Sequence, residues 1–337
     1  MVASLMCLSV STEYYQFLLS FGVLGGLSAC CLFTPSVSTI GHWFNKRQGL
    51  ATGLACTAGG IGGILFSFIT LYLAPRIGFP WTMRIIAFIS LGMCSVACAT
   101  LQTRPRAVLD PVHNEKKKEG PGLIACLRQA VDFKPLAHDP AYLATTIAVW
   151  LVEFAVFLPI TYISSAAIAT GQGIGQQHAY RLIALLNVGS VPGRALPGYL
   201  ADRFGRFNVM IITALVCTIL IFCIWLPPTF LDTANEPALT AFAVLFGFWS
   251  GAAISLTPVC IAQVSKVEEI GRRVGTCFSI SSFGALVGVP IGGAIIDASG
   301  GGFTGLVVFS GCFYVLALLG FLAARFVAGP KRIAAAF

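Results

Sequence analysis

Long apolar runs, separated by short charged or proline- and glycine-containing segments, dominate this chain of 337 residues. Only 10% of the residues are charged and 57% are hydrophobic, whereas a soluble globular domain carries about 25% charged residues. A helix that crosses the hydrocarbon core of a bilayer needs about 20 consecutive apolar residues. The composition therefore excludes a soluble globular protein and predicts a membrane protein with room for about nine or ten spanning helices.

Nine runs are long enough to cross a bilayer: 14–40, 50–73, 82–102, 142–168, 180–201, 208–229, 237–263, 274–297 and 303–327. Runs of this length favour helices over barrel strands, which are about 10 residues long and alternate in polarity. Residues 1–10 are apolar but too short to cross, and they lack the basic region and cleavage site of a signal peptide. We expect an all-α bundle of nine spanning helices, preceded by a stub that is the end of a longer helix.

Lysine and arginine residues predict the orientation of these spans. If loop 41–49 faces the cytoplasm, then loops 103–141, 202–207 and 264–273 and the C-terminal end share that side and together hold 17 of the 21 Lys and Arg residues. The positive-inside rule therefore places the C-terminus in the cytoplasm, and we expect a multi-pass protein of the plasma membrane. The basic residues are spread over five segments and form no single face, which argues against nucleic acid as a partner and leaves the lipid bilayer.

The chain has one long loop, and the part of the chain before this loop resembles the part after it. Arg47, Gly59 and Gly63 recur as Arg272, Gly284 and Gly288 with an offset of 225 residues. A duplicated transporter with two lobes around a central cavity would show such a repeat. The predicted segments are a partial N-terminal transmembrane lobe (1–102), a cytoplasmic inter-lobe loop (103–141), a six-helix C-terminal transmembrane lobe (142–329) and a cytoplasmic tail (330–337).

Metal, cofactor and catalytic chemistry find little support in the sequence. The twelve cysteines show no paired spacing of a zinc site, and the four histidines fall in predicted loops or at span margins. No phosphate-cradling loop is followed by Lys and Ser or Thr, which argues against ATP hydrolysis. We expect no metal, no cofactor and no catalytic residues, so a membrane enzyme is the least favoured alternative.

The segment from Gly198 to Arg206, GYLADRFGR, joins two predicted spans on the cytoplasmic side. A turn this short requires the backbone freedom of Gly205. Asp202 can hold the terminus of a neighbouring helix, and Arg203 and Arg206 can pair with carboxylates, so that these residues form a conformational latch. The alternative is a capped, positively charged turn without such a role. The pattern resembles the cytoplasmic-loop signature of the major facilitator superfamily.

Three further segments are similar to one branch of that superfamily. The run WFNKRQGLATGLA from Trp43 to Ala55 resembles the loop between helices four and five of monocarboxylate-transporter-like proteins, especially fungal members. Residues 187–198 and 288–293 resemble helices eight and eleven of the same branch. The resemblance implies a two-lobe carrier that works by alternating access. It also implies that residue 1 lies near the end of helix three, so that helices one and two are missing.

Arg194 is the first candidate for substrate binding. It lies eight residues before Asp202, which at 1.5 Å per residue is about 12 Å into the membrane. A charge at this depth costs at least about 2.5–3.5 kcal/mol and should face the protein interior or a wet cavity. The guanidinium group suits a carboxylate, and the resemblance associates this position with the substrate anion. The alternative is an interhelical ion pair, or hydrogen bonds to carbonyls near Pro192 and Pro197.

Glu153 is the other charge expected near mid-membrane. It can act as a proton carrier whose protonation releases Arg194 for the substrate, or it can only neutralise Arg194. Animal monocarboxylate carriers have an acidic residue four positions before the arginine, where this chain has Ser190, which weakens the case for proton coupling and for a monocarboxylate. Asn187 and Tyr162 are further substrate candidates, although hydroxyl groups in membrane helices more often bond a backbone.

These observations together predict a secondary transporter of a small organic anion or related metabolite, with protons as a candidate coupling ion. The alternative is a truncated, transport-incompetent or regulatory membrane protein, because the first lobe is incomplete.

Overall fold

The computed structural model describes residues 1–44, 46–100, 134–169, 176–230 and 236–329, and its regular elements in these ranges are all helices. The long loop up to residue 133 and the tail 330–337 lie outside the described residues, as do the predictions made for them. The elements are α1 (Val2–Val10), α2 (Tyr14–Phe17), η1 (Leu18–Gly25), α3 (Gly26–Trp43), α4 (Gln48–Ile77), α5 (Phe79–Thr100), α8 (Lys134–His138), α9 (Pro140–Ala169), α10 (Gln176–Phe204), α11 (Arg206–Leu220), η2 (Ile221–Trp225), α12 (Leu226–Phe230), α13 (Glu236–Gln263), η3 (Val267–Glu269), α14 (Ile270–Ala298) and α15 (Thr304–Ala328).

Eight helical segments in the described ranges are long and apolar enough to cross a bilayer. They confirm the predicted all-α membrane class, because a helix satisfies its backbone hydrogen bonds internally where no water is present. The prediction of nine spans differs at 180–201. This run is helical within α10, but Asn187, Arg194 and several glycines and prolines lower its hydropathy, so composition alone does not identify it as a span.

Two of the predicted spans contain a stretch of π-helix. The span 14–40 includes η1, and the span 208–229 includes η2 between α11 and α12. A π-helix widens the turn locally and shifts the register of the residues that follow it, and π turns occur frequently at functional sites. Nothing in the apolar pattern of these runs indicates the change.

The described chain forms two compact units. One comprises Met1–Trp43 and Gly62–Lys118, and the other comprises Phe44–Ile61 and Glu119–Phe337. Helix α4 therefore contributes its first half to the second unit and continues into the first unit beyond residue 61. The lobe boundaries expected from the sequence, with the whole of 1–102 in one lobe, stay a prediction.

The first unit has a small core where α1 packs against α5. Leu5 and Leu8 of α1 contact Met83, Ile86 and Ala87 of α5. The stub expected at residues 1–10 is thus a helix with a buried face, which includes Ser4 and Ser9.

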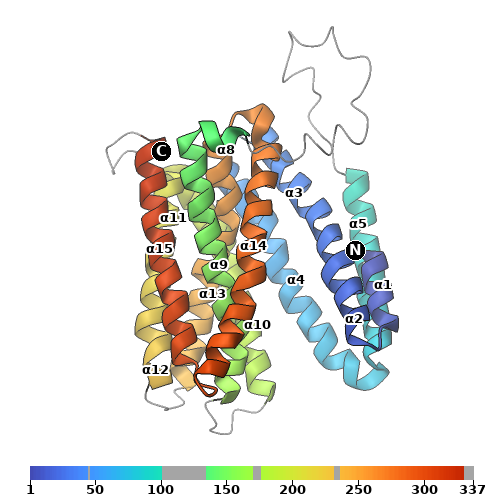
Figure 1. Cartoon of the computed structure of the whole chain (residues 1–337). Coiled ribbons are helices and arrows are strands. Elements are labelled where there is room, and N and C mark those ends of the chain that lie inside the picture. The colour runs from blue at the N-terminus through green and yellow to red at the C-terminus, as the bar shows by residue number, and fades with distance from the viewer. Residues whose placement is uncertain (45, 101–133, 170–175, 231–235, 330–337) are drawn as a thin grey trace. The chain divides into compact units, whose positions relative to one another are not determined.

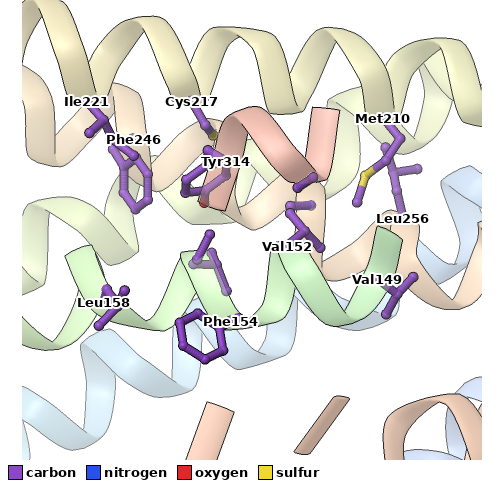
Figure 2. Packing of buried hydrophobic residues seen from close by; sticks show 14 of the residues in the cluster. Val149, Val152, Phe154, Leu158, Met210, Cys217, Ile221, Phe246, Leu256 and Tyr314 are labelled. Carbon is purple, nitrogen blue, oxygen red and sulfur yellow. The ribbon is translucent and has the colours of Figure 1, made fainter. Parts of the chain in front are cut away.

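The second unit is a helical bundle with a continuous apolar core. Helices α9, α10, α11, α13, α14 and α15 run side by side (Figure 1), and Figure 2 shows residues from several of them meeting in the interior. Trp225, Phe242, Phe246 and Tyr314 form a series of ring contacts with centroid separations of 5.2, 5.1 and 6.0 Å. Because lipid tails are as apolar as these side chains, dense packing holds such a bundle together more than exclusion from water does.

Helices α10 and α13 approach closely through glycines on both sides. A Cβ atom built on Gly189 or Gly193 of α10 would overlap the backbone of α13, and one built on Gly247 of α13 would overlap the backbone of α10. Each pair Gly189/Gly193 and Gly247/Gly251 has the four-residue spacing that puts both glycines on one helix face. This contact fixes α10, and with it Arg194, against the bundle.

We predict that Gly193→Ala destabilises the protein, because the added methyl group would overlap the carbonyl oxygen of Phe248, which belongs to a rigid helix backbone. Overpacking of this kind costs about 1–3 kcal/mol, so the unfolding temperature of the detergent-purified protein should fall. Gly92→Ala is the matched control, since a Cβ on Gly92 of α5 meets nothing within 4 Å. Equal unfolding temperatures for the two variants would contradict the close α10–α13 contact.

Candidate functional site

Arg194 of α10 extends toward the first half of α4, within the second unit. Its Nη1 donates a hydrogen bond of 2.7 Å to the carbonyl oxygen of Cys56. Its Nε is buried and has no hydrogen-bond partner. No carboxylate pairs with Arg194 in the described part of the chain. The guanidinium group therefore has no carboxylate to neutralise it, and its buried Nε keeps an unused donor, which is costly away from water.

The pairing of Glu153 with Arg194 that the sequence allowed does not form. Glu153 of α9 is 8% exposed, and its carboxyl group makes no hydrogen bond or ion pair with any described residue. It lies within electrostatic range of Cys277 on α14 and Tyr314 on α15 instead. The expectation was wrong because the two side chains leave their helices toward different neighbours, which spacing along the sequence does not specify.

Asn187 and Tyr162 bond to helix backbones. Asn187 Nδ2 donates to the carbonyl oxygen of Ile183 one turn earlier, at 3.0 Å. The hydroxyl group of Tyr162 donates to the carbonyl oxygen of Val289 on α14, at 2.7 Å. Asn187 lies two turns from Arg194 and thus on the same face of α10. Asn187 thus shares a face of α10 with Arg194, about 10 Å away along the helix axis, whereas Tyr162 lies at the contact between α9 and α14.

Asp202 binds the N-terminus of α4. Its Oδ1 accepts a hydrogen bond from the backbone N–H of Gly49, and its Oδ2 accepts one from that of Leu50, each at 2.8 Å. The first N–H groups of a helix have no partner within the helix, and the helix dipole adds a partial positive charge there. The Asp202 carboxylate accepts hydrogen bonds from two of these N–H groups, and its negative charge is attracted by the partial positive charge. A Cβ atom on Gly49 would lie 2.5 Å from the carbonyl oxygen of Gly198, so this close contact depends on glycine.

The other members of the predicted latch have different surroundings. Gly205 has φ = +97°, a conformation that favours glycine, and it precedes the first turn of α11. Arg206, the first residue of α11, lies within electrostatic range of Asp202. Arg203 is exposed and pairs with no carboxylate among the described residues, contrary to the expectation for it.

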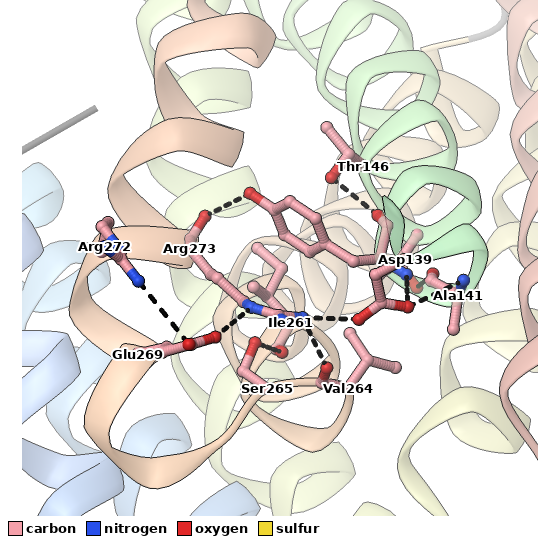
Figure 3. Close-up of polar contacts among 11 residues, drawn as sticks. Asp139, Ala141, Thr146, Ile261, Val264, Ser265, Glu269, Arg272 and Arg273 are labelled. Carbon is pink, nitrogen blue, oxygen red and sulfur yellow. Dashed lines mark hydrogen bonds and ion pairs between the residues drawn. The ribbon is translucent and has the colours of Figure 1, made fainter. Parts of the chain in front are cut away.

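A second polar cluster at the ends of α9, α13 and α14 was not anticipated from the sequence (Figure 3). Arg273 Nη1 contacts Asp139 Oδ2 at 2.8 Å and also donates to the carbonyl oxygen of Val264, while Arg273 Nε donates to Glu269 at 3.0 Å. Tyr142 donates to the carbonyl oxygen of Arg273 at 2.8 Å. The cluster joins the start of α14 to the start of α9 and the end of α13.

Asp139 in this cluster caps α9 as well. Its Oδ1 accepts hydrogen bonds from the backbone N–H groups of Ala141 and Tyr142. Partial burial by itself would raise the pKa of this carboxyl group, but the hydrogen bonds from Arg273 and from the two backbone groups outweigh it and lower the pKa. Two sequence signals, although not used above, are compatible with this cluster: an aspartate directly before Pro140 at a helix start, and the four-residue spacing of Glu269 and Arg273.

Among the described residues, no group of three or more His, Cys, Asp or Glu residues could hold a metal ion. The described cysteines are all free thiols, and Cys126 lies outside the described residues. Among the sequence-predicted polar residues that the structure describes, Arg194 and Glu153 have no charged partner, and Asp202 contacts the start of α4.

Comparison with known proteins gives concordant matches. A family model described as Major Facilitator Superfamily matches residues 1–234 and 182–334. MFS-type transporter 1 of Ophiocordyceps sp. is 37% identical over 98% of this chain and 69% of its own length. A riboflavin transporter of Saccharomyces cerevisiae is 36% identical over 88% of this chain and 57% of its own length. A solved bacterial homologue of the human lysosomal transporter Spinster has the same fold, with a TM-score of 0.54 at 16% identity over 96% of this chain and 80% of that chain.

We predict that Asp202→Asn weakens the attachment of the α4 N-terminus, because the amide group lacks the negative charge and offers one acceptor oxygen in place of two. Loss of such a cap costs about 0.5–2 kcal/mol. Amide hydrogen exchange of the peptide that contains Gly49 and Leu50 should become faster. Asp297→Asn is the control, because it removes the same charge at an exposed site near the C-terminal end of α14. Unchanged exchange at Gly49 and Leu50 in Asp202→Asn would rule out the cap.

Proposed function

The chain belongs to the major facilitator superfamily, and on that premise we propose that it is a secondary transporter of a small organic anion. Transport would proceed by alternating access, in which the two lobes of a carrier rock about a binding site near mid-membrane. The relatives reported above are named transporters and not enzymes, so the membrane-enzyme alternative is set aside.

The unpaired charge of Arg194 is the observation that carries this proposal. An arginine that served only to hold two helices together would have its donors occupied, whereas here the buried Nε has no partner and no described carboxylate neutralises the group. A bound carboxylate would supply both the missing acceptor and the missing charge through two charge-assisted hydrogen bonds. Asn187, two turns away on the same face of α10, would provide a second polar contact to the same ligand.

The surroundings of Glu153 support the proposal that a proton is the coupling ion. Glu153 does not pair with Arg194, so the proton would bind at a separate site. The ionised form of Glu153 would be buried without a cation or a hydrogen-bond donor, at a cost of several kcal/mol. Binding and release of a proton by Glu153 therefore require a change in its surroundings. A rearrangement of α14 or α15, which carry Cys277 and Tyr314 near this carboxyl group, would meet that requirement.

The contact of Asp202 with the start of α4 would serve as the conformational latch. Helix α4 belongs to the second unit only up to residue 61, so motion of the first unit would pull on a helix whose start is attached to Asp202. Breaking two hydrogen bonds to a carboxylate costs more than breaking neutral ones. We further propose that this end of the bundle, with the C-terminus, faces the cytoplasm and that the protein resides in the plasma membrane.

We predict that Arg194→Gln lowers the kcat/KM for organic anions by about 10- to 100-fold, the range that corresponds to a charged hydrogen-bond pair of about 1.5–3 kcal/mol. The assay is uptake of radiolabelled lactate, pyruvate and benzoate by proteoliposomes that contain the purified protein. Arg181→Gln is the matched control, since Arg181 lies in the same helix and is exposed. Transport of every accepted anion at the wild-type rate by Arg194→Gln would refute the substrate role.

We predict that Glu153→Gln removes the acceleration of uptake by an inward proton gradient but leaves exchange of substrate across the membrane intact. The glutamine side chain has nearly the same shape as that of glutamate, but its amide group does not bind and release a proton at the pH of the assay. Uptake is compared with and without the pH gradient, and Glu236→Gln, at an exposed helix end, serves as the control. A gradient effect that persists in Glu153→Gln, or a wild type that shows none, would dismiss the proton role.

A further inference from the structure

The guanidinium group of Arg194 rests on a bare part of the α4 backbone. Its Nη1 donates to the carbonyl oxygen of Cys56 at 2.7 Å, and a Cβ atom built on Gly59 would lie only 2.5 Å from the same nitrogen. Residues 56 and 59 are three apart and so lie on the same helix face. Gly59 is exposed, in contrast to the buried Cys56. The absence of a side chain at residue 59 therefore leaves the space that the guanidinium group occupies.

Other glycines of α4 on this side have a different neighbour. A Cβ atom on Gly53 would overlap the backbone carbonyl of Arg194, and one on Gly60 would lie 2.8 Å from the branched side chain of Val191. Both glycines thus allow α4 and α10 to pack closely. For Gly59, in contrast, the three nearest atoms all belong to the flexible end of the Arg194 side chain. Helix packing alone does not require glycine at this position.

The choice of a carbonyl oxygen as the partner of Nη1 also has a chemical consequence. A carboxylate in that position would neutralise the arginine, whereas a backbone carbonyl orients the group and leaves its charge for another ligand. With Nη1 engaged, the edge formed by Nε and Nη2 remains. The two donors of this edge match the two oxygens of a planar carboxylate.

We propose that Gly59 is a positioning residue for the anion site: its bare backbone and the Cys56 carbonyl hold the Arg194 guanidinium so that the Nε and Nη2 edge receives the substrate carboxylate. This inference rests on the proposed function of Arg194 in substrate binding. A methyl group at residue 59 would push Nη1 by about 1 Å to reach ordinary van der Waals separation, which breaks the bond to Cys56 and turns the edge away from its place.

The test is Gly59→Ala, measured in the wild type and in an Arg194→Lys background by uptake of lactate, pyruvate and benzoate into proteoliposomes. We expect the apparent KM for the transported carboxylate to rise about tenfold or more, with an unchanged unfolding temperature. Lysine has no Nη1, so we expect Gly59→Ala to add no further change in the Arg194→Lys background. Gly62→Ala is the control in the same helix, because its Cβ would meet only the ring of Phe66 at 3.7 Å. Gly59→Ser places the same Cβ and replaces the alanine variant if that variant does not accumulate in the membrane.

The outcomes separate this inference from the function on which it rests. If Arg194→Lys impairs transport but Gly59→Ala leaves KM unchanged, or raises KM equally in both backgrounds, then Gly59 does not act through Arg194 and the inference is overturned. If Arg194→Lys and Arg194→Gln both transport at the wild-type rate, the proposed function itself fails. A rise in KM that is confined to the Arg194 background supports both.

Discussion

Arg194 is a charged residue on a helix of the apolar bundle, and its hydrogen bond connects α10 with α4. Its backbone lies in α10, whose glycines pack directly against the backbone of α13. Its side chain reaches the opposite way and bonds to the carbonyl oxygen of Cys56 in α4. The partner is neutral and one buried donor stays unused, so the charge persists in a place where a charge is expensive. Such an arrangement is stable only if the surrounding helices fix it, and it leaves the charge for the anionic ligand that we propose.

The same helix pair carries the proposed latch. Arg194 and Asp202 are eight residues apart in α10, and their partners Cys56 and Gly49 are seven residues apart in α4, in the opposite order. The two helices therefore run antiparallel and are fastened at two levels about two turns apart. A change in the contact of Asp202 with α4 would be transmitted along a stiff helix to the carbonyl group that holds Arg194. This arrangement gives a physical link between the state of the latch and the orientation of the guanidinium group.

Sequence patterns predicted the helical membrane class, because apolar runs of this length have few other stable structures in lipid. They also indicated Gly205, whose positive φ a short turn requires. They did not predict contacts that depend on the direction in which a side chain leaves its helix. Glu153 and Arg194 are both buried charges, but one lies near α14 and α15 while the other contacts α4. The Asp139–Arg273 cluster depends on helix ends that are far apart in the sequence. Helix α10 falls below the hydropathy of a span because it carries the polar residues proposed for function.

If Arg194 presents a free positive charge to a carboxylate, binding of a carboxylate should stabilise the purified protein, and this stabilisation can be measured directly. A ligand that binds the folded state raises the unfolding temperature, by an amount that increases with the logarithm of its concentration relative to its Kd. Each of benzoate, lactate and pyruvate is compared with its neutral amide, in the wild type and in Arg194→Gln. We expect that at least one carboxylate stabilises the wild type, that its amide does not, and that Arg194→Gln loses the effect. Equal stabilisation by carboxylate and amide, or an effect that persists in Arg194→Gln, would contradict it.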